Sequence, residues 1–187
     1  MTQPQAKFNG MKVLLGITGG IAAYKAADLA SKLTGSGAVV RTIMTENACK
    51  LITPACLQAL TGQPVYTSLW ADPKDFRIGH IQLAEWADVV VVAPATADII
   101  GKVAGGICND LLSTTLCACW DKKVLLAPAM NSHMWANPIV QRNLAILQEQ
   151  LKFKTVGPET GRLACGTEGI GRMAEVAAII DALAGLL

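Results

Sequence analysis

Continuous apolar runs of strand length most strongly limit the folds open to this chain. Asp88–Ala93 reads D-V-V-V-V-A and Met11–Thr18 reads M-K-V-L-L-G-I-T, and neither alternates between apolar and polar residues. Strands of this kind are buried on both faces, which occurs in parallel sheets covered by helices on each side. We therefore expect these two segments to be central strands of such a sheet.

The remaining segments alternate between strand-like and helix-like patterns. Further strands are expected at 38–44, 123–127 and 153–156. Helices are expected at 21–33, 53–60, 80–87, 96–104, 110–118, 138–151 and 174–187, and another helix is expected to begin at residue 45. Residues 61–79 are expected to form a hairpin or loop, and 157–171 a glycine-rich flap. The alternation predicts one α/β domain over 11–187, a doubly wound, mostly parallel sheet of Rossmann-like or flavodoxin-like type with helices on both faces. Residues 1–10 are expected to be a flexible tail.

The composition indicates a chain that associates with copies of itself. Charged residues make up 16% of the 187 residues, against roughly 25% in soluble domains. Hydrophobic residues make up 52%, which predicts a homo-oligomer with buried contacts between subunits. The net charge of +2 gives no reason to expect nucleic acid or a membrane surface as a partner. No apolar run approaches the ~20 residues that span a bilayer.

The cysteines favour a reducing compartment and argue against a metal site. The chain has six cysteines and two histidines, and its polar start lacks the apolar core of a signal peptide. We therefore expect reduced thiols in the cytoplasm, with every cysteine except Cys165 filling the core. Cys117-x-Cys119 has no second cysteine pair, so no metal site is predicted.

One apolar loop follows the strand expected at 123–127. The stretch Val124–Trp135 reads V-L-L-A-P-A-M-N-S-H-M-W, in which a proline ends the strand and Asn131 and His133 follow. Open α/β sheets bind their ligands at the carboxyl ends of the strands. Because this loop is unusually apolar for a surface segment, it is expected to cover a flat ligand.

Other strand ends are predicted to reach the same crevice. Gly16-x-x-Gly19-Gly20 lies at a strand-to-helix turn, where glycines let the backbone approach a ligand and free N–H groups face an anion. A tight turn without a ligand is the alternative. Thr45 and Thr96 also follow strand ends, where a hydroxyl can bond a phosphate or ribityl group. Taken singly, each threonine is better explained as a helix cap.

His80 and Cys165 are the residues best suited to proton transfer. His80 begins a short helix, whose positive end keeps a histidine ring neutral and able to accept a proton. A histidine that only caps or packs is the alternative. Cys165 lies in the flap between Arg162 and Arg172, and nearby arginines lower the pKa of an accessible thiol. His133 is expected to have an incidental role.

Together these segments resemble one family, the homo-oligomeric flavin-containing cysteine decarboxylases. The resemblance is carried by G-I-T-G-G-I-A-A-Y-K (16–25), G-H-I-Q-L-A-E-W-A-D (79–88), A-P-A-T-A-D (93–98), P-A-M-N-S-H-M-W (128–135) and A-C-G-x-x-G-x-G-R-M (164–173). It extends from Met11 to Met173. The last two motifs are specific, whereas the glycine turn alone is weak.

The resemblance implies an FMN cofactor and roles for particular residues. The residues implied to bind FMN are Gly19, Gly20, Ile21, Thr45, Asn47, Ala93, Pro94, Ala95, Thr96, Ala129 and Met130. The resemblance further implies that Asn131 holds the substrate carboxylate, with Met130 and Ala164 also in contact with substrate. His80 is implied to act as base, and Cys165 to donate a proton from a substrate clamp at 157–171.

The motifs are most similar to those of family members that decarboxylate 4′-phosphopantothenoylcysteine to 4′-phosphopantetheine in coenzyme A biosynthesis. The implied reaction oxidises the cysteinyl thiol to a thioaldehyde, whose C=S group accepts the electrons released when carbon dioxide leaves. The flavin then returns the electrons, and Cys165 protonates the intermediate. The family also suggests trimers or assemblies of trimers such as a dodecamer, with the flavin near a subunit boundary.

Other functions remain open on the sequence. A peptidyl-cysteine decarboxylase shares the fold and cofactor but stops at the enethiolate, and the intact flap argues against it. An FMN-binding regulatory protein without catalysis is disfavoured because His80, Asn131 and Cys165 are all present. A nicotinamide dehydrogenase is disfavoured because its fingerprint is G-x-G-x-x-G. Many bacterial relatives continue into a synthetase domain, so the chain is either stand-alone, which would leave room for another cysteinyl substrate, or part of such a protein.

Overall fold

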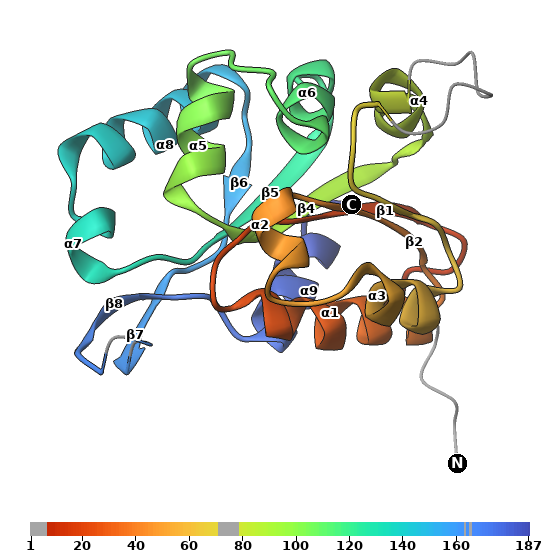
Figure 1. Cartoon of the computed structure of the whole chain (residues 1–187), viewed down its shortest axis with the longest axis horizontal. Helices are drawn as coiled ribbons and strands as arrows, with labels where there is room; N and C mark the ends of the chain where they lie inside the picture. The colour runs from red at the N-terminus through yellow and green to blue at the C-terminus, as the bar shows by residue number, and fades with distance from the viewer. Residues whose placement is uncertain (1–6, 71–78, 163, 165) are drawn as a thin grey trace.

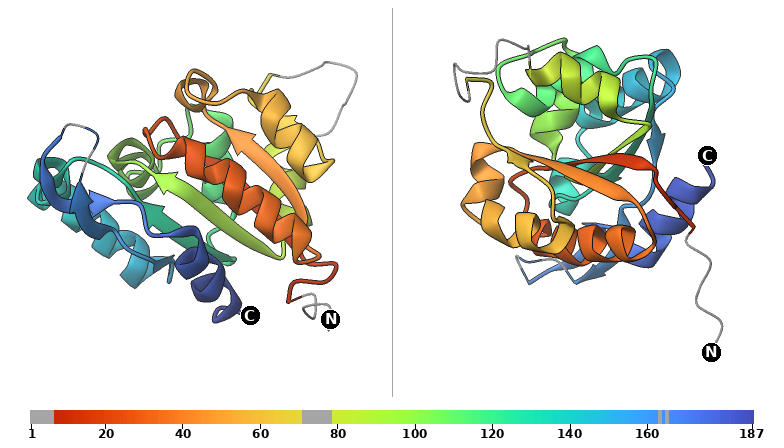
Figure 2. Two further views of the ribbon diagram at one scale, coloured as in Figure 1. Left: turned by 90° about the horizontal axis from the view of Figure 1, so that it is seen from below. Right: turned by 90° about the vertical axis from the view of Figure 1, so that its right-hand side faces the viewer.

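The computed structural model describes residues 7–70, 79–162, 164 and 166–187, which form an open sheet between two layers of helices. The strands are β1 (Lys12–Ile17), β2 (Val39–Met44), β3 (Val65–Tyr66), β4 (Val89–Ala95), β5 (Lys123–Pro128), β6 (Lys154–Thr155), β7 (Glu159–Arg162) and β8 (Glu168–Arg172). The helices are α1 (Ala23–Gly35), α2 (Glu46–Cys49), α3 (Pro54–Thr61), α4 (Gly79–Trp86), α5 (Ala97–Ala104), α6 (Leu111–Ala118), α7 (Ser132–Trp135), α8 (Pro138–Gln150) and α9 (Val176–Ala184). Helices α1, α3 and α9 cover one face of the sheet, and α4, α5, α6 and α8 cover the other (Figure 1). Figure 2 shows the twisted sheet between these layers.

The large sheet has the topology of a doubly wound fold. Its strands are all parallel and follow the order β3-β2-β1-β4-β5-β6. The direction of winding therefore reverses between β1 and β4, which are paired over Val13–Gly16. This is the strand order of dinucleotide-binding α/β folds, and the predicted fold class is confirmed. Such sheets bind ligands in the crevice where the order reverses.

The apolar runs explain why these strands are central. All of β4 is buried, as are all residues of β1 and β5 after the first lysine of each. A strand that buries both faces needs a cover on each side, which the crossover helices of a parallel sheet provide. Burial of one valine or leucine side chain contributes about 1.5–3 kcal/mol. These runs thus hold the carboxyl ends of β1, β4 and β5 side by side.

Two apolar clusters attach the helices to the sheet. One includes Leu29 of α1, Leu57 of α3 and Ile179 of α9, and the other is formed with α4, α5, α6 and α8. Gly16 of β1 lets α6 approach closely, because a Cβ at that position would lie 2.6 Å from Leu112 Cδ1. Close packing on both faces therefore fixes the strand ends that surround the crevice.

Some short elements differ from their predictions. The sequence predicts a hairpin or loop over 61–79, whereas Val65–Tyr66 forms the edge strand β3, parallel to β2. The predicted apolar loop contains the one-turn helix α7, and the predicted flap contains an antiparallel hairpin of β7 and β8. Elements this short contain too few residues to show a periodic pattern. Residues 71–78 lie outside the described residues.

The prediction for the cysteines is wrong for two thiols. Cys119 is fully buried, and this burial raises the pKa of its thiol to about 11. Cys49 and Cys56 are partly buried, but Cys108 and Cys117 are exposed. Cys117 falls on the outer face of α6 and Cys108 in the loop before it, so neither reaches the core. All five described cysteines are free thiols.

Large apolar side chains lie on the surface. Trp70 is 89% exposed, Tyr24 66% and Trp120 64%. Such a surface favours association, and the homo-oligomer stays a prediction. In the ranges that the structure describes, no helix has the length and apolar character to span a membrane. The same ranges contain no group of three or more His, Cys, Asp or Glu side chains placed to hold a metal ion.

Candidate cofactor and substrate site

A cleft of about 660 Å³ opens at the carboxyl ends of β1, β4 and β5. It is surrounded by the starts of α1 and α5, the β5–α7 loop and the β7–β8 hairpin, which lies beside α7 in Figure 1. Its lining residues are Gly19, Gly20, Ile21, Ala22, Tyr24, Lys25, Thr96, Ala97, Ala129, Met130, Asn131, Met134, Arg162, Ala164, Gly171, Arg172 and Met173. The cleft therefore lies where the strand order reverses, and its size suits a small-molecule ligand.

Thr18 joins the two turns that form the floor of the cleft. Its buried hydroxyl donates to the Pro94 carbonyl at 2.7 Å and accepts the Thr96 N–H at 3.3 Å. A Cβ on Gly20 would lie 3.3 Å from Thr96 Cγ2, and a Cβ on Gly19 would overlap the Asn47 side chain. The two glycines therefore have a packing role in addition to any contact with a ligand, because they let the start of α1 approach the β4–α5 turn and α2.

Thr45 and Thr96 use their hydroxyls differently. Thr45 Oγ1 accepts the Ala48 N–H at 3.3 Å and so caps α2, which confirms the capping alternative for this residue. Thr96 occupies the corresponding position before α5, but its side chain makes no cap hydrogen bond and lines the cleft. Thr96 therefore lines the cleft without capping α5, and a bond from its hydroxyl to a ligand stays a prediction.

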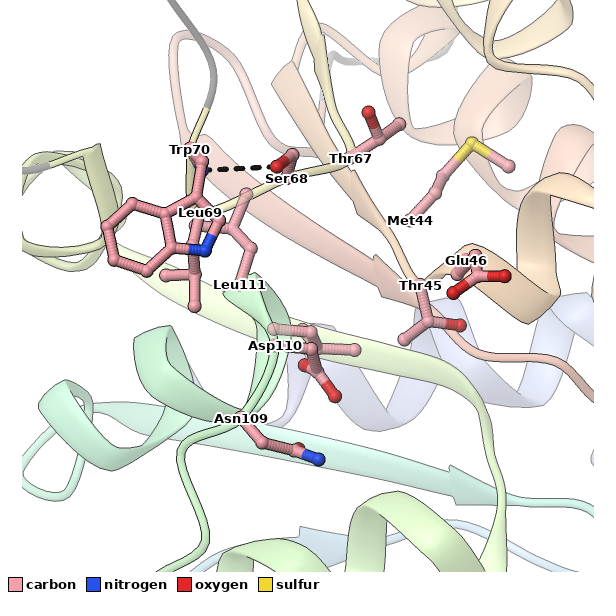
Figure 3. Close-up of a pocket in the computed structure, with 11 residues that line it drawn as sticks. Met44, Thr45, Glu46, Thr67, Ser68, Leu69, Trp70, Asn109, Asp110 and Leu111 are labelled. Carbon is pink, nitrogen blue, oxygen red and sulfur yellow. Dashed lines mark hydrogen bonds between the residues drawn. The ribbon is translucent and has the colours of Figure 1, made fainter.

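A smaller cavity of about 180 Å³ lies beside the end of β2. Figure 3 shows Thr45 and Glu46 on one side of it and Asp110 on another. Burial by itself raises the pKa of the Asp110 carboxyl, but the Ser113 N–H and the Lys102 ammonium bond it and lower that pKa below its usual value. The carboxylate thus stays charged and caps α6. Thr45, predicted to bind FMN, lines this cavity and not the larger cleft.

The β5–α7 loop forms one wall of the cleft. It presents Ala129, Met130 and Asn131, as the apolar stretch predicts. Asn131 precedes α7, and its Oδ1 accepts the His133 N–H at 2.8 Å. The Met130 N–H donates to the Gly171 carbonyl at 3.0 Å and thereby joins the loop to the hairpin. His133 lines neither cavity.

Four charged side chains hold the hairpin against α1 and the start of α9. Lys25 pairs with Glu175 at 3.1 Å, and Arg172 pairs with Glu159 at 3.0 Å and with Glu175 at 3.4 Å. Glu159 also accepts the Glu175 N–H at 3.1 Å, and this bond, together with Arg172, lowers the pKa of the Glu159 carboxyl. Single exposed ion pairs contribute little, but this connected set fixes where the hairpin meets the cleft.

The cleft is electrostatically suited to an anionic ligand. Lys25, Arg162 and Arg172 line it, and none of its described lining residues is Asp or Glu. Helix α1, which has 13 residues, begins at the cleft without an acidic residue in its first turn, so the positive end of its dipole is not offset. Ile21 and Met130 add apolar surface. The cleft thus offers a helix start for an anionic group beside an apolar wall for a flat one.

Most of the predicted site residues lie around this one cleft. Those that line it are Gly19, Gly20, Ile21, Thr96, Ala129, Met130, Asn131 and Ala164. Ala93, Pro94 and Ala95 form the buried end of β4. Asn47 packs against Gly19.

Of the two residues predicted to transfer protons, His80 is not brought to the cleft. His80 is partly buried on α4 and lines neither cavity. Figure 1 places α4 and α7 at opposite ends of the molecule. Cys165 lies outside the described residues. A single chain therefore does not place His80 beside Asn131.

Sequence reasoning assigned no role to Thr18 or Lys25. Thr18 is a polar residue at the end of an apolar strand, which signals a hydrogen-bonding role when the strand is buried. Lys25 lies in the first turn of α1, directly after the glycine turn that lines the cleft. Both residues lie in the motif at 16–25. Their partners, Pro94 and Glu175, are distant in sequence, so the sequence alone does not identify the contacts.

The chain is similar to bacterial biosynthetic proteins. It matches the Flavoprotein family over residues 1–187. It is 47% identical over 167 residues to the coenzyme A biosynthesis bifunctional protein CoaBC of Bacillus subtilis (strain 168), a match that covers 89% of this chain and 41% of that protein. For CoaBC of Escherichia coli (strain K12), the identity is 45% over 172 residues, covering 92% and 42%. The chain thus spans about two fifths of the length of these curated relatives.

Solved structures share both the fold and part of the sequence. A mutant of PPC decarboxylase complexed with pantothenoylaminoethenethiol has a TM-score of 0.81 and 36% identity, covering 94% of this chain and 97% of that chain. The FMN binding protein AtHal3 has a TM-score of 0.79 and 34% identity, covering 94% and 95%. The fold and the cleft define a doubly wound α/β protein with an open cleft where the strand order reverses. The chain belongs to the Flavoprotein family, and its predicted resemblance to the flavin-containing cysteine decarboxylases is confirmed.

Proposed function

We propose that this chain binds FMN and decarboxylates 4′-phosphopantothenoylcysteine to 4′-phosphopantetheine, a step of coenzyme A biosynthesis. One juxtaposition carries the proposal: the glycine turn before α1 and Asn131 line the same cleft. The similarity to bacterial CoaBC proteins and to PPC decarboxylase supports it. The proposed location is the cytoplasm, because these relatives are bacterial biosynthetic proteins.

The walls of the cleft suit a flavin mononucleotide. The start of α1 and the Thr96 hydroxyl can bond the phosphate, and the apolar surface of Ala129 and Met130 can pack against the ring. Bound FMN would accept two electrons from the substrate thiol and return them after carbon dioxide has left. The protein's part is to orient the substrate and to exclude water from the reacting groups.

Asn131 is proposed to hold the carboxylate that leaves. Its neutral amide can donate a hydrogen bond to a carboxylate without forming an ion pair. An ion pair would stabilise the charged ground state, whereas the transition state is losing this charge. The bond from the His133 N–H at 2.8 Å orients the amide, since it assigns acceptance to Oδ1 and donation to Nδ2.

His80 is proposed to be the base, supplied by a second copy of the chain. Its helix, α4, lies at the opposite end of the molecule from α7 (Figure 1), and His80 lines neither cavity. A site that uses both His80 and Asn131 therefore requires association, and we propose a trimer or a dodecamer built from trimers. Ile21 and Tyr24 line the cleft and are 64% and 66% exposed, which gives a neighbouring subunit an apolar surface to cover.

Cys165 is proposed to donate the final proton. It directly follows Ala164, which lines the cleft. The proton would go to the carbon that lost carbon dioxide, so the clamp over 157–171 would complete the reaction after decarboxylation. Replacing Cys165 by serine should accumulate the oxidised enethiol.

Mass analysis of 4′-phosphopantothenoylcysteine incubated with the FMN-loaded protein tests the proposed activity. Loss of carbon dioxide alone corresponds to the complete reaction. Loss of carbon dioxide together with two hydrogens corresponds to the oxidative half only, which is the reaction expected of a peptidyl-cysteine decarboxylase. An unchanged mass refutes the activity, and a purified protein that does not take up FMN refutes the cofactor.

Two histidine variants and a mixing experiment test the site. His80→Asn should keep the flavin and lose carbon dioxide release, whereas His133→Asn should keep both because the His133 ring lines neither cavity. Co-expression of His80→Asn and Asn131→Ala chains should restore part of the activity, since some shared sites would then combine one intact residue from each chain. Mixed assemblies as inactive as either variant would contradict a site shared between copies.

A further inference from the structure

Arg162 differs from the other two cations that line the cleft. Lys25 and Arg172 are both bonded to Glu175, at 3.1 and 3.4 Å. Arg162 lies at the end of β7 and has neither an ion pair nor a side-chain hydrogen bond with any residue in the described part of the chain. Its partner across the hairpin is Glu168, and the two form no ion pair. The guanidinium of Arg162 is thus not neutralised by an acid from the described residues.

The hairpin that carries Arg162 is fixed in place on its other strand. Gly171 of β8 accepts the Met130 N–H at 3.0 Å, and Arg172 is bonded to acids on both sides. A cation on a fixed strand is oriented before a ligand arrives, which reduces the entropy lost on binding. Lys25 and Arg172 hold this hairpin, so among the described lining residues Arg162 is the cation that remains for a ligand.

We propose that Arg162 binds the phosphate group of the substrate, an inference that rests on the proposed function. The substrate has two anionic groups, a carboxylate and a phosphate. The carboxylate is lost in the reaction, and a guanidinium paired with it would stabilise the ground state. The phosphate is unchanged throughout, so a cation can bind it equally in the ground state and the transition state. Arginine suits this role because its parallel N–H donors match the oxygens of a phosphate.

This assignment predicts which kinetic constant changes. A contact that is equally strong in both states lowers KM and leaves kcat unchanged. One hydrogen bond between charged groups corresponds to about tenfold in kcat/KM. Because Arg162 is exposed, added salt should weaken the contact.

The experiment compares 4′-phosphopantothenoylcysteine with pantothenoylcysteine, which lacks only the phosphate. Both are assayed with the FMN-loaded wild type, with Arg162→Gln and Arg162→Lys, and with the control Arg142→Gln. Arg142 is exposed on α8, outside the cleft, and bonds Asn143 at 3.2 Å. The wild type should prefer the phosphorylated substrate about tenfold in kcat/KM. Arg162→Gln should lose this preference through a higher KM alone, Arg162→Lys should keep part of it, and Arg142→Gln should match the wild type.

Each other outcome overturns the assignment in a recognisable way. An equal loss on both substrates would place Arg162 at the carboxylate or in the support of the hairpin. Loss of bound FMN from Arg162→Gln, measured by flavin absorbance, would place it at the cofactor. A wild type that uses both substrates equally well would refute the phosphate contact and leave the proposed function intact, whereas a wild type inert on both would refute the two together.

A salt series on the wild type needs no variant and covers the case in which Arg162→Gln does not fold. The preference for the phosphorylated substrate should shrink as salt rises, while the kinetics of pantothenoylcysteine stay nearly constant. A preference that does not respond to salt would also overturn the contact.

Discussion

Replacing Gly171 by alanine should detach the β7–β8 hairpin from the β5–α7 loop and leave the sheet intact. Gly171 has a φ of +149°, and its carbonyl accepts the Met130 N–H at 3.0 Å. A Cβ at this position would overlap the Met130 carbonyl oxygen. That neighbour is backbone attached to the buried strand β5, so it cannot rotate aside as a flexible side chain can. The hairpin itself must therefore move.

Two contributions set the size of the effect. An alanine held in a sparsely populated backbone conformation costs about 1–3 kcal/mol, and the lost hydrogen bond costs about 1 kcal/mol. Docking of the hairpin is then weakened by roughly 2–4 kcal/mol. Since 1.4 kcal/mol is a tenfold change, the undocked fraction should rise roughly 30-fold to 700-fold. The midpoint of global unfolding should change far less, because no residue of the sheet core is altered.

Amide hydrogen exchange at Met130 measures this undocking directly, because local opening controls the exchange rate. Gly161→Ala is the matched control in the same hairpin, since its Cβ would lie 3.3 Å from Arg172 Nε, at the far end of a flexible side chain. The Met130 amide should exchange at least roughly 30-fold faster in Gly171→Ala, and near the wild-type rate in Gly161→Ala. Wild-type exchange in Gly171→Ala would refute the docking argument.

Two further predictions concern thiols and the pH dependence of the hairpin. At neutral pH, an alkylating reagent should modify Cys108 and Cys117 in the native protein, because both thiols are exposed. It should not modify Cys119, whose thiol is buried with a pKa raised to about 11. Peptide masses that show Cys119 modified before unfolding would contradict its burial. The hydrogen bond from the Glu175 N–H lowers the pKa of the Glu159 carboxyl. The ionised carboxylate therefore stabilises the docked hairpin fully at pH values above its unfolded pKa of about 4.3. This stabilisation is lost as the pH falls through the lower pKa of the folded protein. The NMR shift of the Glu175 amide should therefore titrate with a midpoint below about 4.3 and lose this transition in Glu159→Gln, and a higher midpoint would contradict the linkage.

The central strands could be predicted because each one is marked by a run of consecutive apolar residues. Val89–Val92 is apolar throughout, and a run of that kind needs cover on both faces wherever it lies in the chain. The edge strand Val65–Tyr66 and the helix Ser132–Trp135 could not be predicted in the same way. Both are stabilised by neighbours, β2 in one case and the Asn131 cap in the other, and neither is long enough to show a period.

The candidate site was predictable only to the extent that its residues follow strand ends. Gly19 and Asn131 do so, and the topology of a doubly wound sheet brings such positions to one edge. The bond from Thr18 to the Pro94 carbonyl joins residues that are 76 positions apart, and no local pattern records it. No local pattern shows that the charge of Arg162 is unpaired either. Its lack of an ion pair is seen only once the fold has placed Glu175 beside Lys25 and Arg172.

Under the proposed function, the separation of His80 from Asn131 gives the apolar composition of the chain a chemical reason. Helix α4 precedes β4 and α7 follows β5, and Figure 1 places these two helices at opposite ends of the molecule. A second chain would bring its own His80 to this cleft without any change in the sheet. Such a contact would cover exposed apolar side chains at the cleft such as Ile21 and Tyr24. The exposed apolar surface of a single chain would then be the subunit interface, and formation of that interface would complete the active site.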